Sequence, residues 1–228
     1  MCAEEVKSDL LRTKDCYDIY VSGYSISGVY IITTIDGPVQ VYCEMEAVEK
    51  IEKGHWLVFL RRMDGEVNFF RRWESYKKGF GNKTCEHWLG LEFLHELTTR
   101  YQYKLRVDLE DFEGKKAYSV YDSFSVGSEA TGYKLQVSGF VDGGAGQTFI
   151  YHNGLKFSTF DKDNSGANCA KKYSQGGFWY NGCDYTNPTG LYWWGKDDNN
   201  LMSGPFWYYW KNNYKSLKAV TMKIRRVM

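Results

Sequence analysis

The most informative stretch of the chain is FSTFDKDNSGANCAKKYSQGGFWYNGC, residues 157–183. Asp161 and Asp163 lie in a polar loop of Asn, Ser and Gly residues that has neither helical nor strand periodicity. Carboxylates and free carbonyl oxygens on an irregular loop are the hard oxygen ligands that calcium takes. Cys169 follows this loop and Cys183 follows an aromatic run, and a cysteine loop of this size is typical of a structural disulfide in an oxidising compartment. The stretch therefore predicts a secreted protein that carries calcium and binds something beside the metal.

Length and charge argue against several classes of protein. With 228 residues the chain is long enough for one large domain or two small ones, and it can bury a substantial core. Its formal net charge of +1 gives no long-range field for nucleic acid or an anionic membrane. No apolar run approaches the ~18 residues that a membrane span needs. Met1 is followed at once by Cys2 and acidic residues, so we expect any signal peptide to have been removed or left out of this sequence.

The six cysteines favour structural disulfides over a zinc site. Their spacing is wide and uneven, no C-x-x-C pair occurs, and the four histidines are scattered. Aromatic residues make up 18% of the chain, and a density this high admits two interpretations. The rings could form a mixed core with polar handles, or they could form a ring-rich binding surface. For the C-terminal third both interpretations stay open.

The hydrophobic pattern predicts an α+β fold with an antiparallel sheet and few helices. Apolar residues recur at helical spacing over residues 86–100. The Asp-Gly pair at 64–65 predicts a hairpin turn from a strand at 56–63 into VNFFRRW at 67–73. Gly, Asn, Asp and aromatic residues dominate residues 142–210, which predicts a loop-rich lobe held by calcium and a disulfide. The other expected strands are 27–32 and 39–45, divided by a turn at 36–38, then 103–112, 115–126, 132–141 and 221–227.

An enzyme is not expected from these residues. No Ser/His/Asp or Cys/His set has suitable neighbours, and the carboxylate pair of the 157–183 stretch would already be occupied by calcium. The glycine-rich DGGAG at 142–146 lacks the Lys and the Ser or Thr of a phosphate loop and precedes no expected helix. A nucleotide site is therefore not predicted either.

A series of ordered motifs runs along the chain from Asp15 to Arg226. The motifs are DCYDIYVSGYSISGVYII, VYCEME, YKKGFGN, EHWLGLEFLHELT, YKLRVDLEDFEGKKAY, FVDGGAGQTFIYHNGLKFSTFDKDN, NCAKKY and TMKIRR. Together they resemble the fibrinogen-related C-terminal domain family, and in wording they are most similar to its microfibril-associated glycoprotein 4 group. The resemblance implies a leader at 1–14 and a fibrinogen-like domain at 15–228, with subdomains of about 15–55, 56–141 and 142–228.

The resemblance also implies two disulfides and a calcium site. The disulfides would join Cys16 to Cys43 in the first subdomain and Cys169 to Cys183 in the lobe. Calcium would be held by four oxygens at alternate positions of an extended loop, all facing one side. With only two carboxylates the affinity should be modest, with a dissociation constant on the order of 10⁻⁴ M. The expected ligands are the side chains of Asp161 and Asp163 and the backbone carbonyls of Ser165 and Ala167.

The acetyl-binding cup of the family carries over only in half. Relatives that bind acetyl groups use a Tyr four residues after the first lobe cysteine, a His after the second, and a Tyr-Ala pair further on. Here Tyr173 keeps the first position, but Asp184 replaces the His, and Leu201-Met202 replaces the Tyr-Ala pair. The family also implies a cis peptide before the second cysteine, here between Gly182 and Cys183. An ionised Asp cannot donate a hydrogen bond, so acetylated sugars should bind weakly.

Other residues near the half cup suggest different ligands. Trp193, Trp194, Asp197 and Asp198 suit stacking on a sugar face, or a cationic group held by carboxylates. Alternatively these residues only pack or make subunit contacts. Two functions therefore stay open. The first is a secreted lectin of innate immunity that recognises glycans or acetylated ligands with calcium. The second is an extracellular-matrix protein that docks on fibrous proteins or on its own subunits.

Cys2 and Cys85 remain outside the two disulfides that the family implies. They could pair with each other or with other chains, and we expect Cys2 to form bonds between chains, because oligomerising bonds are common in family leaders. Such bonds would make the protein a homo-oligomer. Cys85 adjoins the sequon Asn82-Lys83-Thr84, so its segment should be exposed, with Asn82 as a glycosylation site.

Overall fold

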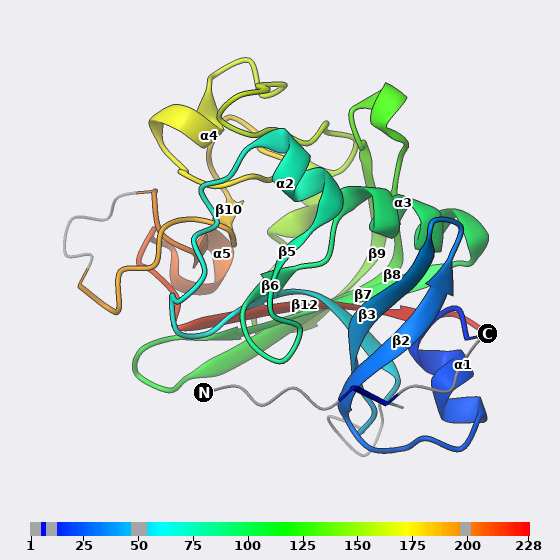
Figure 1. The fold of residues 1–228 in the computed structure, drawn as a ribbon. Helices are drawn as coiled ribbons and strands as arrows, with labels where there is room; N and C mark the ends of the chain where they lie inside the picture. The colour runs from blue at the N-terminus through cyan, green and yellow to red at the C-terminus, as the bar shows by residue number, and fades with distance from the viewer. Residues whose placement is uncertain (1–5, 8–12, 47–53, 197–201) are drawn as a thin grey trace.

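One mixed sheet forms the body of the protein and confirms the predicted α+β class. The computed structural model describes residues 6–7, 13–46, 54–196 and 202–228 (Figure 1). Within them the sheet has the strand order β1-β2-β3-β4-β12-β7-β8-β9, with β6 joined to β4 and β5 to β6. Every pair is antiparallel except β1 with β2. The strands are β1 Val6–Lys7, β2 Gly28–Thr34, β3 Gly37–Glu44, β4 Trp56–Arg62, β5 Phe80–Gly81, β6 His87–Trp88, β7 Tyr103–Glu110, β8 Lys116–Val126, β9 Leu135–Gly143 and β12 Ala219–Arg226.

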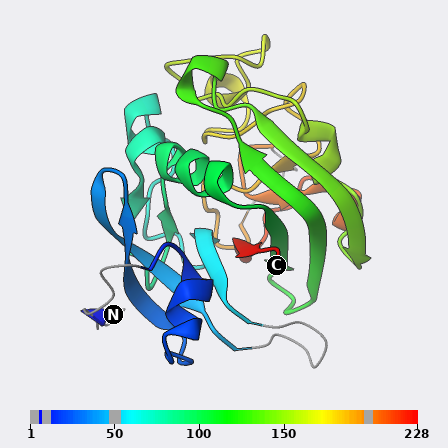
Figure 2. The same cartoon turned by 90° about the vertical axis from the view of Figure 1, so that its right-hand side faces the viewer.

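The strand from the C-terminal end of the chain lies in the middle of this sheet. Val220 of β12 is paired with Arg62 of β4 on one side and with Leu109 of β7 on the other. The three expected subdomains thus all contribute strands to one sheet, and the division between them stays a prediction. Figures 1 and 2 show the β2–β3 hairpin and α1 (Cys16–Val21) at one end and the loop-rich lobe at the other.

Helix α3 (Leu91–Arg100) covers one face of the sheet and packs on β8. Leu91, Leu94 and Leu97 are buried there, as the helical spacing of apolar residues predicts. The predicted start at residue 86 is wrong. His87 and Trp88 instead form β6 and pair with β4. The helix begins only after Gly90, because the φ of 122° at this glycine is not a helical conformation. The other helices are α2 (Trp73–Lys78), α4 (Cys169–Lys172), α5 (Tyr208–Lys211) and the 3₁₀ turns η1 (Glu129–Thr131) and η2 (Phe149–His152).

The predicted hairpin after Asp64-Gly65 is also wrong. No strand forms over residues 67–73, and the turn leads through irregular backbone into α2. The reason is a buried carboxylate. Glu86 accepts hydrogen bonds from the backbone N–H groups of residues 63, 64, 65 and 67, so these groups are satisfied without a neighbouring strand.

The C-terminal lobe has little regular structure, as its composition predicts. It contains one two-stranded sheet, β10 (Thr186–Asn187) with β11 (Phe206–Trp207). Its aromatic residues divide between the two interpretations left open by the sequence. Phe157, Trp179 and Trp207 are at most 1% exposed and extend the core of the body into the lobe, whereas other rings reach the surface. In the described part of the chain, none of the helices is long and apolar enough to cross a bilayer.

Two disulfides pair as the family resemblance implies. Cys16 is bonded to Cys43 in the N-terminal part, and Cys169 is bonded to Cys183 in the lobe. Bonds of this kind agree with an extracellular protein. Cys85 is disulfide-bonded as well, and Cys2 lies outside the described residues.

Candidate functional site

The predicted calcium loop lies between a short β-bridge and α4 and contacts the body through Asp161. The Oδ1 atom of Asp161 accepts a hydrogen bond from the backbone N–H of Trp73 at 2.9 Å and another from the hydroxyl of Thr159 at 2.7 Å. Trp73 is the first residue of α2, and Arg72 before it supplies no side-chain cap. Asp161 therefore satisfies an N–H group that the helix cannot satisfy itself. The ammonium of Lys162 lies 3.8 Å from the centre of the Trp73 ring, a second contact between loop and helix.

Asp163 organises the rest of the loop. Its carboxylate accepts the backbone N–H of Ser165 at 3.1 Å and that of Asn168 at 3.3 Å. Partial burial acts to raise the pKa of Asp163, but the hydrogen bonds from Ser165, Asn168 and Gly166 outweigh it and hold the pKa below its usual value. Asp163 is therefore a carboxylate at neutral pH, the state in which it can bind a cation.

The donor set of this loop fits a calcium ion. Both carboxylates are exposed, and within the described residues no hydrogen bond uses the carbonyl oxygens of Ser165 or Ala167. No group of three or more His, Cys, Asp or Glu side chains that could hold a metal occurs in the described ranges. A cation here would thus be held by two carboxylates, backbone carbonyls and water, which suits calcium better than a transition metal.

A sharp turn places the residues after Cys183. Gly182 and Cys183 have φ angles of 57° and 70°, and Tyr185 also has a φ of 70°. The expected cis peptide between Gly182 and Cys183 is wrong, because that bond is trans. The chain instead reverses through consecutive left-handed residues, a conformation that non-glycine residues adopt rarely and mostly at constrained functional turns.

The buried side chain of Asn187 holds the lobe together and is a residue that sequence reasoning missed. Its amide donates to the carbonyls of Ser174, Met202 and Gly204 at 2.7 to 3.1 Å. Its carbonyl accepts the hydroxyl of Tyr180 at 3.2 Å. The Asn187 side chain thus joins two segments of the lobe, one 13 residues before it and one 17 residues after it in the sequence.

The predicted ligand residues fall into separate places. Tyr173 is 49% exposed at the end of α4. The carbonyls of Ser174, the next residue, and of Met202 both accept the buried amide of Asn187. Asp184 is half-buried, with the hydroxyl of Tyr214 at 3.5 Å from its carboxylate. Leu201, Asp197 and Asp198 lie outside the described residues.

The two tryptophans contact other parts of the chain. The indole N–H of Trp193 donates to the hydroxyl of Ser203 at 3.2 Å, and that of Trp194 donates to the carbonyl of Asp64 at 2.9 Å. Trp194 therefore lies against the loop after β4. The described contacts do not join either ring to Asp184.

Three surface tyrosines form a cluster that the sequence does not reveal. The rings of Tyr151, Tyr185 and Tyr209, here called the tyrosine cluster, lie within 15° of parallel, with centres 4.6 to 6.2 Å apart. Tyr151 and Tyr209 are both about two-fifths exposed. A hydrogen bond with Tyr151 raises the pKa of Tyr209 to about 12, so the Tyr209 hydroxyl stays protonated at neutral pH. The three residues are too far apart in sequence for any local pattern to predict their contact.

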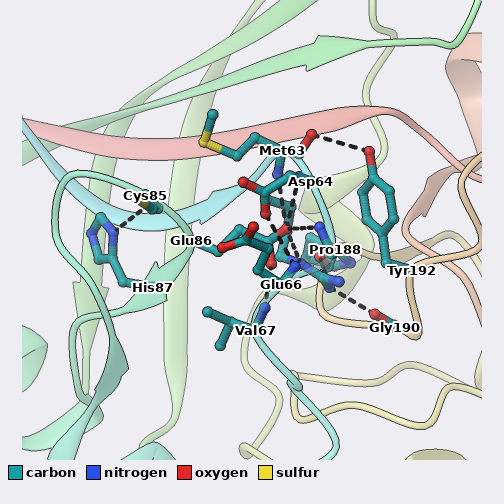
Figure 3. Close-up of polar contacts among 12 residues, drawn as sticks. Met63, Asp64, Glu66, Val67, Cys85, Glu86, His87, Pro188, Gly190 and Tyr192 are labelled. Atoms are coloured by element: carbon teal, nitrogen blue, oxygen red, sulfur yellow. Dashed lines mark hydrogen bonds and ion pairs between the residues drawn. The ribbon is translucent and has the colours of Figure 1, made fainter. Parts of the chain in front are cut away.

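A buried ion pair joins the body to the lobe (Figure 3). Arg62 lies 3.4 Å from Glu86, and both side chains are at most 1% exposed. Arg62 also donates to the carbonyl of Gly190 at 2.7 Å, while Glu86 binds the backbone of the loop after β4. The pair therefore fixes that loop and the lobe segment around residue 190 to each other.

The sequon is less exposed than expected. Asn82 is half-buried, and its side-chain carbonyl accepts the N–H and the hydroxyl of Thr84 at 2.9 and 2.8 Å. Cys85 is buried, which contradicts the expectation of an exposed segment. The reason is its position in the short turn between β5 and β6, which packs against β4. Glycosylation of Asn82 stays a prediction.

Comparison with known proteins gives close relatives over nearly the whole chain. Microfibril-associated glycoprotein 4 of mouse is 47% identical over 96% of this chain and 87% of that protein. Tenascin of chicken is 45% identical over 93% of this chain, which corresponds to only 11% of tenascin.

Solved structures agree with these sequence relatives. The fibrinogen-like globe domain of human ANGPTL2 has a TM-score of 0.86 and 38% identity, covering 94% of this chain and 99% of that one. Lamprey fibrin D-dimer, solved with the peptide Gly-His-Arg-Pro-amide, has a TM-score of 0.85 and 34% identity over 97% of this chain and 77% of its own. The family model described as the C-terminal globular domain of fibrinogen beta and gamma chains matches residues 12–227. The chain belongs to the fibrinogen C-terminal domain family.

Proposed function

We propose that this protein is a non-enzymatic recognition module of the extracellular matrix, which docks on fibrous matrix proteins through its C-terminal lobe. The tyrosine cluster is the observation that carries the proposal. Tyrosine supplies a large, rigid ring and a polar hydroxyl, and it is enriched at the energetic centres of protein interfaces. The relatedness to a protein named for its association with microfibrils supports a matrix partner.

The geometry of the cluster suits a protein partner. The rings stack on one another, so the exposed parts of the cluster can contact apolar groups of a docked chain, and its hydroxyls can bind the backbone of that chain. The backbone of Tyr151 is also fixed, because its carbonyl accepts a hydrogen bond from the side-chain amide of Asn181 at 2.6 Å. A surface that is already ordered loses little conformational entropy on binding.

Calcium in this proposal orders the lobe rather than touching the partner. The loop at 161–167 contacts the body through the hydrogen bond that the backbone N–H of Trp73 donates to Asp161, and it precedes the disulfide-bonded Cys169. A bound ion would hold both ends of this connection. Docking should then weaken when calcium is removed.

Binding to isolated microfibrils tests the proposal. The purified domain and its Tyr151→Ser and Tyr209→Ser variants are titrated onto immobilised microfibrils, with calcium and with EDTA. Each variant should bind about tenfold more weakly, because interface tyrosines commonly contribute more than ~1 kcal/mol. Tyr20→Ser is the matched control, since Tyr20 is 44% exposed on α1 at the opposite end of the molecule. Equal binding by all variants would refute the proposal.

A second candidate is calcium-supported recognition of glycans or acetylated ligands, and the position of Tyr173 favours it. Tyr173 is exposed, and it keeps the position that supplies one wall of the acetyl cup in relatives. The cup lacks its His, so N-acetylglucosamine should bind only at millimolar level, and cationic ligands should bind better beside Asp184. Asp184→His should raise the affinity for N-acetylglucosamine and lower that for cations. Tight calcium-dependent binding of N-acetylglucosamine by the parent would show that a complete cup exists. A glycan array with and without EDTA separates the two candidates.

A further inference from the structure

We propose that a pocket at the junction of body and lobe binds a single sugar ring by stacking it on Trp194. This junction pocket has a volume of about 280 Å³ and lies between residues 65–69 and residues 190–194. It is distinct from the tyrosine cluster and from Tyr173 and Asp184, which do not line it. The inference goes beyond the proposed function and does not depend on it.

The walls of the junction pocket are rigid because both rest on the buried ion pair. Glu86 binds the backbone N–H groups of the 65–69 wall, and Arg62 binds the carbonyl of Gly190 in the other wall (Figure 3). The guanidinium of Arg62 also stacks 4.1 Å from the centre of the Phe69 ring. Gly65 has a φ of 79°, and a Cβ there would lie 2.7 Å from the Tyr192 ring, so the two walls already touch at their base. A pocket built this way needs no rearrangement to accept a ligand.

Trp194 is held as a fixed, exposed platform. Its indole N–H is bound to the carbonyl of Asp64, and its ring meets that of Tyr192 edge-on at 5.5 Å, yet 59% of the residue stays exposed. Its φ is 50°, a left-handed conformation that a bulky residue adopts rarely. Strained residues of this kind concentrate at ligand sites. Exposing an indole on strained backbone costs free energy of folding. Binding of a ligand to the exposed face would explain why this arrangement is kept.

The rim of the junction pocket adds polar groups to this aromatic wall. Glu66 and Asn68 are exposed on the side formed by the loop after β4. The side-chain carbonyl of Asn68 accepts the N–H of Phe70 at 2.8 Å, so its amide group remains as a donor. The rim thus combines an acceptor, Glu66, with a donor, Asn68.

This combination fits a sugar better than an apolar side chain. A pyranose has one face of C–H groups for an indole and hydroxyls on its edge that both donate and accept hydrogen bonds. An apolar peptide side chain would leave the carboxylate and the amide desolvated and unpaired at the rim. The volume is at the small end for ligand sites, which limits the occupant to one ring.

Saturation-transfer NMR with methyl glycosides tests the proposal. Methyl α-D-mannopyranoside, methyl β-D-galactopyranoside and methyl β-D-glucopyranoside are titrated onto the parent protein to about 30 mM, a range that detects millimolar dissociation constants. At least one should bind, with transfer concentrated on the C–H protons of one sugar face. Trp194→Ala should weaken this binding about tenfold, and Glu66→Ala about threefold. These losses are of the size expected for one stacked ring and one hydrogen bond.

Three further variants keep the result interpretable. Trp194→Phe retains a ring and should bind within about threefold of the parent, even if Trp194→Ala lowers the stability of the loop. Tyr20→Ala changes an exposed ring on α1, outside the junction pocket and outside the lobe, and should leave the binding unchanged. Tyr173→Ala tests whether the half cup is the sugar site instead. The proposal is overturned if no glycoside binds, if Tyr173→Ala rather than Trp194→Ala abolishes binding, or if benzyl alcohol displaces the sugar at lower concentration. None of these outcomes bears on docking through the tyrosine cluster, which is measured with other residues.

Discussion

The sheet and the lobe satisfy their backbone polar groups in different ways. In the sheet, long ladders such as β7 with β8 and β12 pair each strand over most of its length. In the lobe the two strands are only two residues long. There, single side chains form the hydrogen bonds to backbone groups that a strand ladder forms in the sheet. Glu86 binds four N–H groups at the junction, and Asn187 binds three carbonyls inside the lobe. Stability in the lobe should therefore depend on a few side chains, whereas in the sheet it is distributed over many bonds.

The largest effect is expected at the junction. Glu86→Gln would leave Arg62 as an unpaired buried charge and weaken the bonds to the loop after β4, so the free energy of unfolding should fall by about 3–5 kcal/mol. Glu110→Gln is the matched change in the sheet, where the carboxylate is partly exposed beside Lys218, and it should cost at most ~1 kcal/mol. Urea denaturation of both variants checks the difference. Similar losses for the two would contradict the contrast between the regions.

A smaller effect is expected inside the lobe. Asn187→Ala would leave the carbonyls of Ser174, Met202 and Gly204 without a donor, at a cost of about 2–3 kcal/mol. Hydrogen exchange should speed up over residues 174–196 while β7 and β8 keep their protection. Uniform loss of protection over the whole chain would show that lobe and sheet unfold as one unit.

The predicted calcium loop sharpens the comparison, because a loop that binds calcium should be stabilised only when the ion is present. With a dissociation constant on the order of 10⁻⁴ M, about 1 mM calcium should stabilise the parent by ~1.4 kcal/mol. Asp161→Ala should remove this increment, so its melting temperature should fall further below that of the parent when calcium is present. Asp142→Ala, which changes an acidic turn outside the loop, should keep the full response to calcium. A calcium titration of the melting temperature that is identical for Asp161→Ala and the parent would rule out the site.

The smallest effect concerns the two buried histidines, one in each region. Burial lowers the pKa of His152 in the lobe to about 4 and that of His87 in the sheet to about 3. Both fall below the ~6.5 of an unfolded chain, so the unfolded state binds more protons, and stability is lost as the pH falls through 6.5 toward these values. Between about pH 7.5 and pH 6 each should contribute ~0.8 kcal/mol of loss.

His152→Phe isolates the contribution of the lobe. Its ring would remain among Phe149 and Phe178, but it could not titrate. The variant should therefore lose about half of the histidine-dependent slope when denaturation midpoints are measured against pH. An unchanged slope would mean that the pKa of His152 is the same in the folded and the unfolded chain.

The sheet could largely be predicted from the sequence, because strand alternation and turn residues are local signals. Residues 103–112, 115–126 and 221–227 form strands close to the predicted bounds. The helix at 86–100 was displaced at its start because Trp88 pairs with β4, a contact that helical spacing cannot report.

In the candidate sites too, the sequence predicted local motifs but not contacts between distant residues. Both disulfide pairings follow from the family resemblance and are confirmed, whereas calcium binding by the loop at 161–167 stays a prediction. Glu86, Asn187 and the tyrosine cluster depend on partners far along the chain, and no local pattern marks them. Trp194 was selected for its ring, but its contact with Asp64 across 130 residues places it beside the loop after β4, in the junction pocket that the family resemblance does not describe.

The central position of β12 has a consequence for how the chain is made. Residues 219–226 leave the ribosome after every other strand described, yet they fill the gap between β4 and β7. Until they arrive, a nascent chain must hold two open strand edges side by side, and exposed edges are sites of aggregation. Pairing β4 with a partner more than 150 residues later also makes folding slow. A chain that stops before Ala219 should therefore be a substrate for chaperones rather than a shorter working domain.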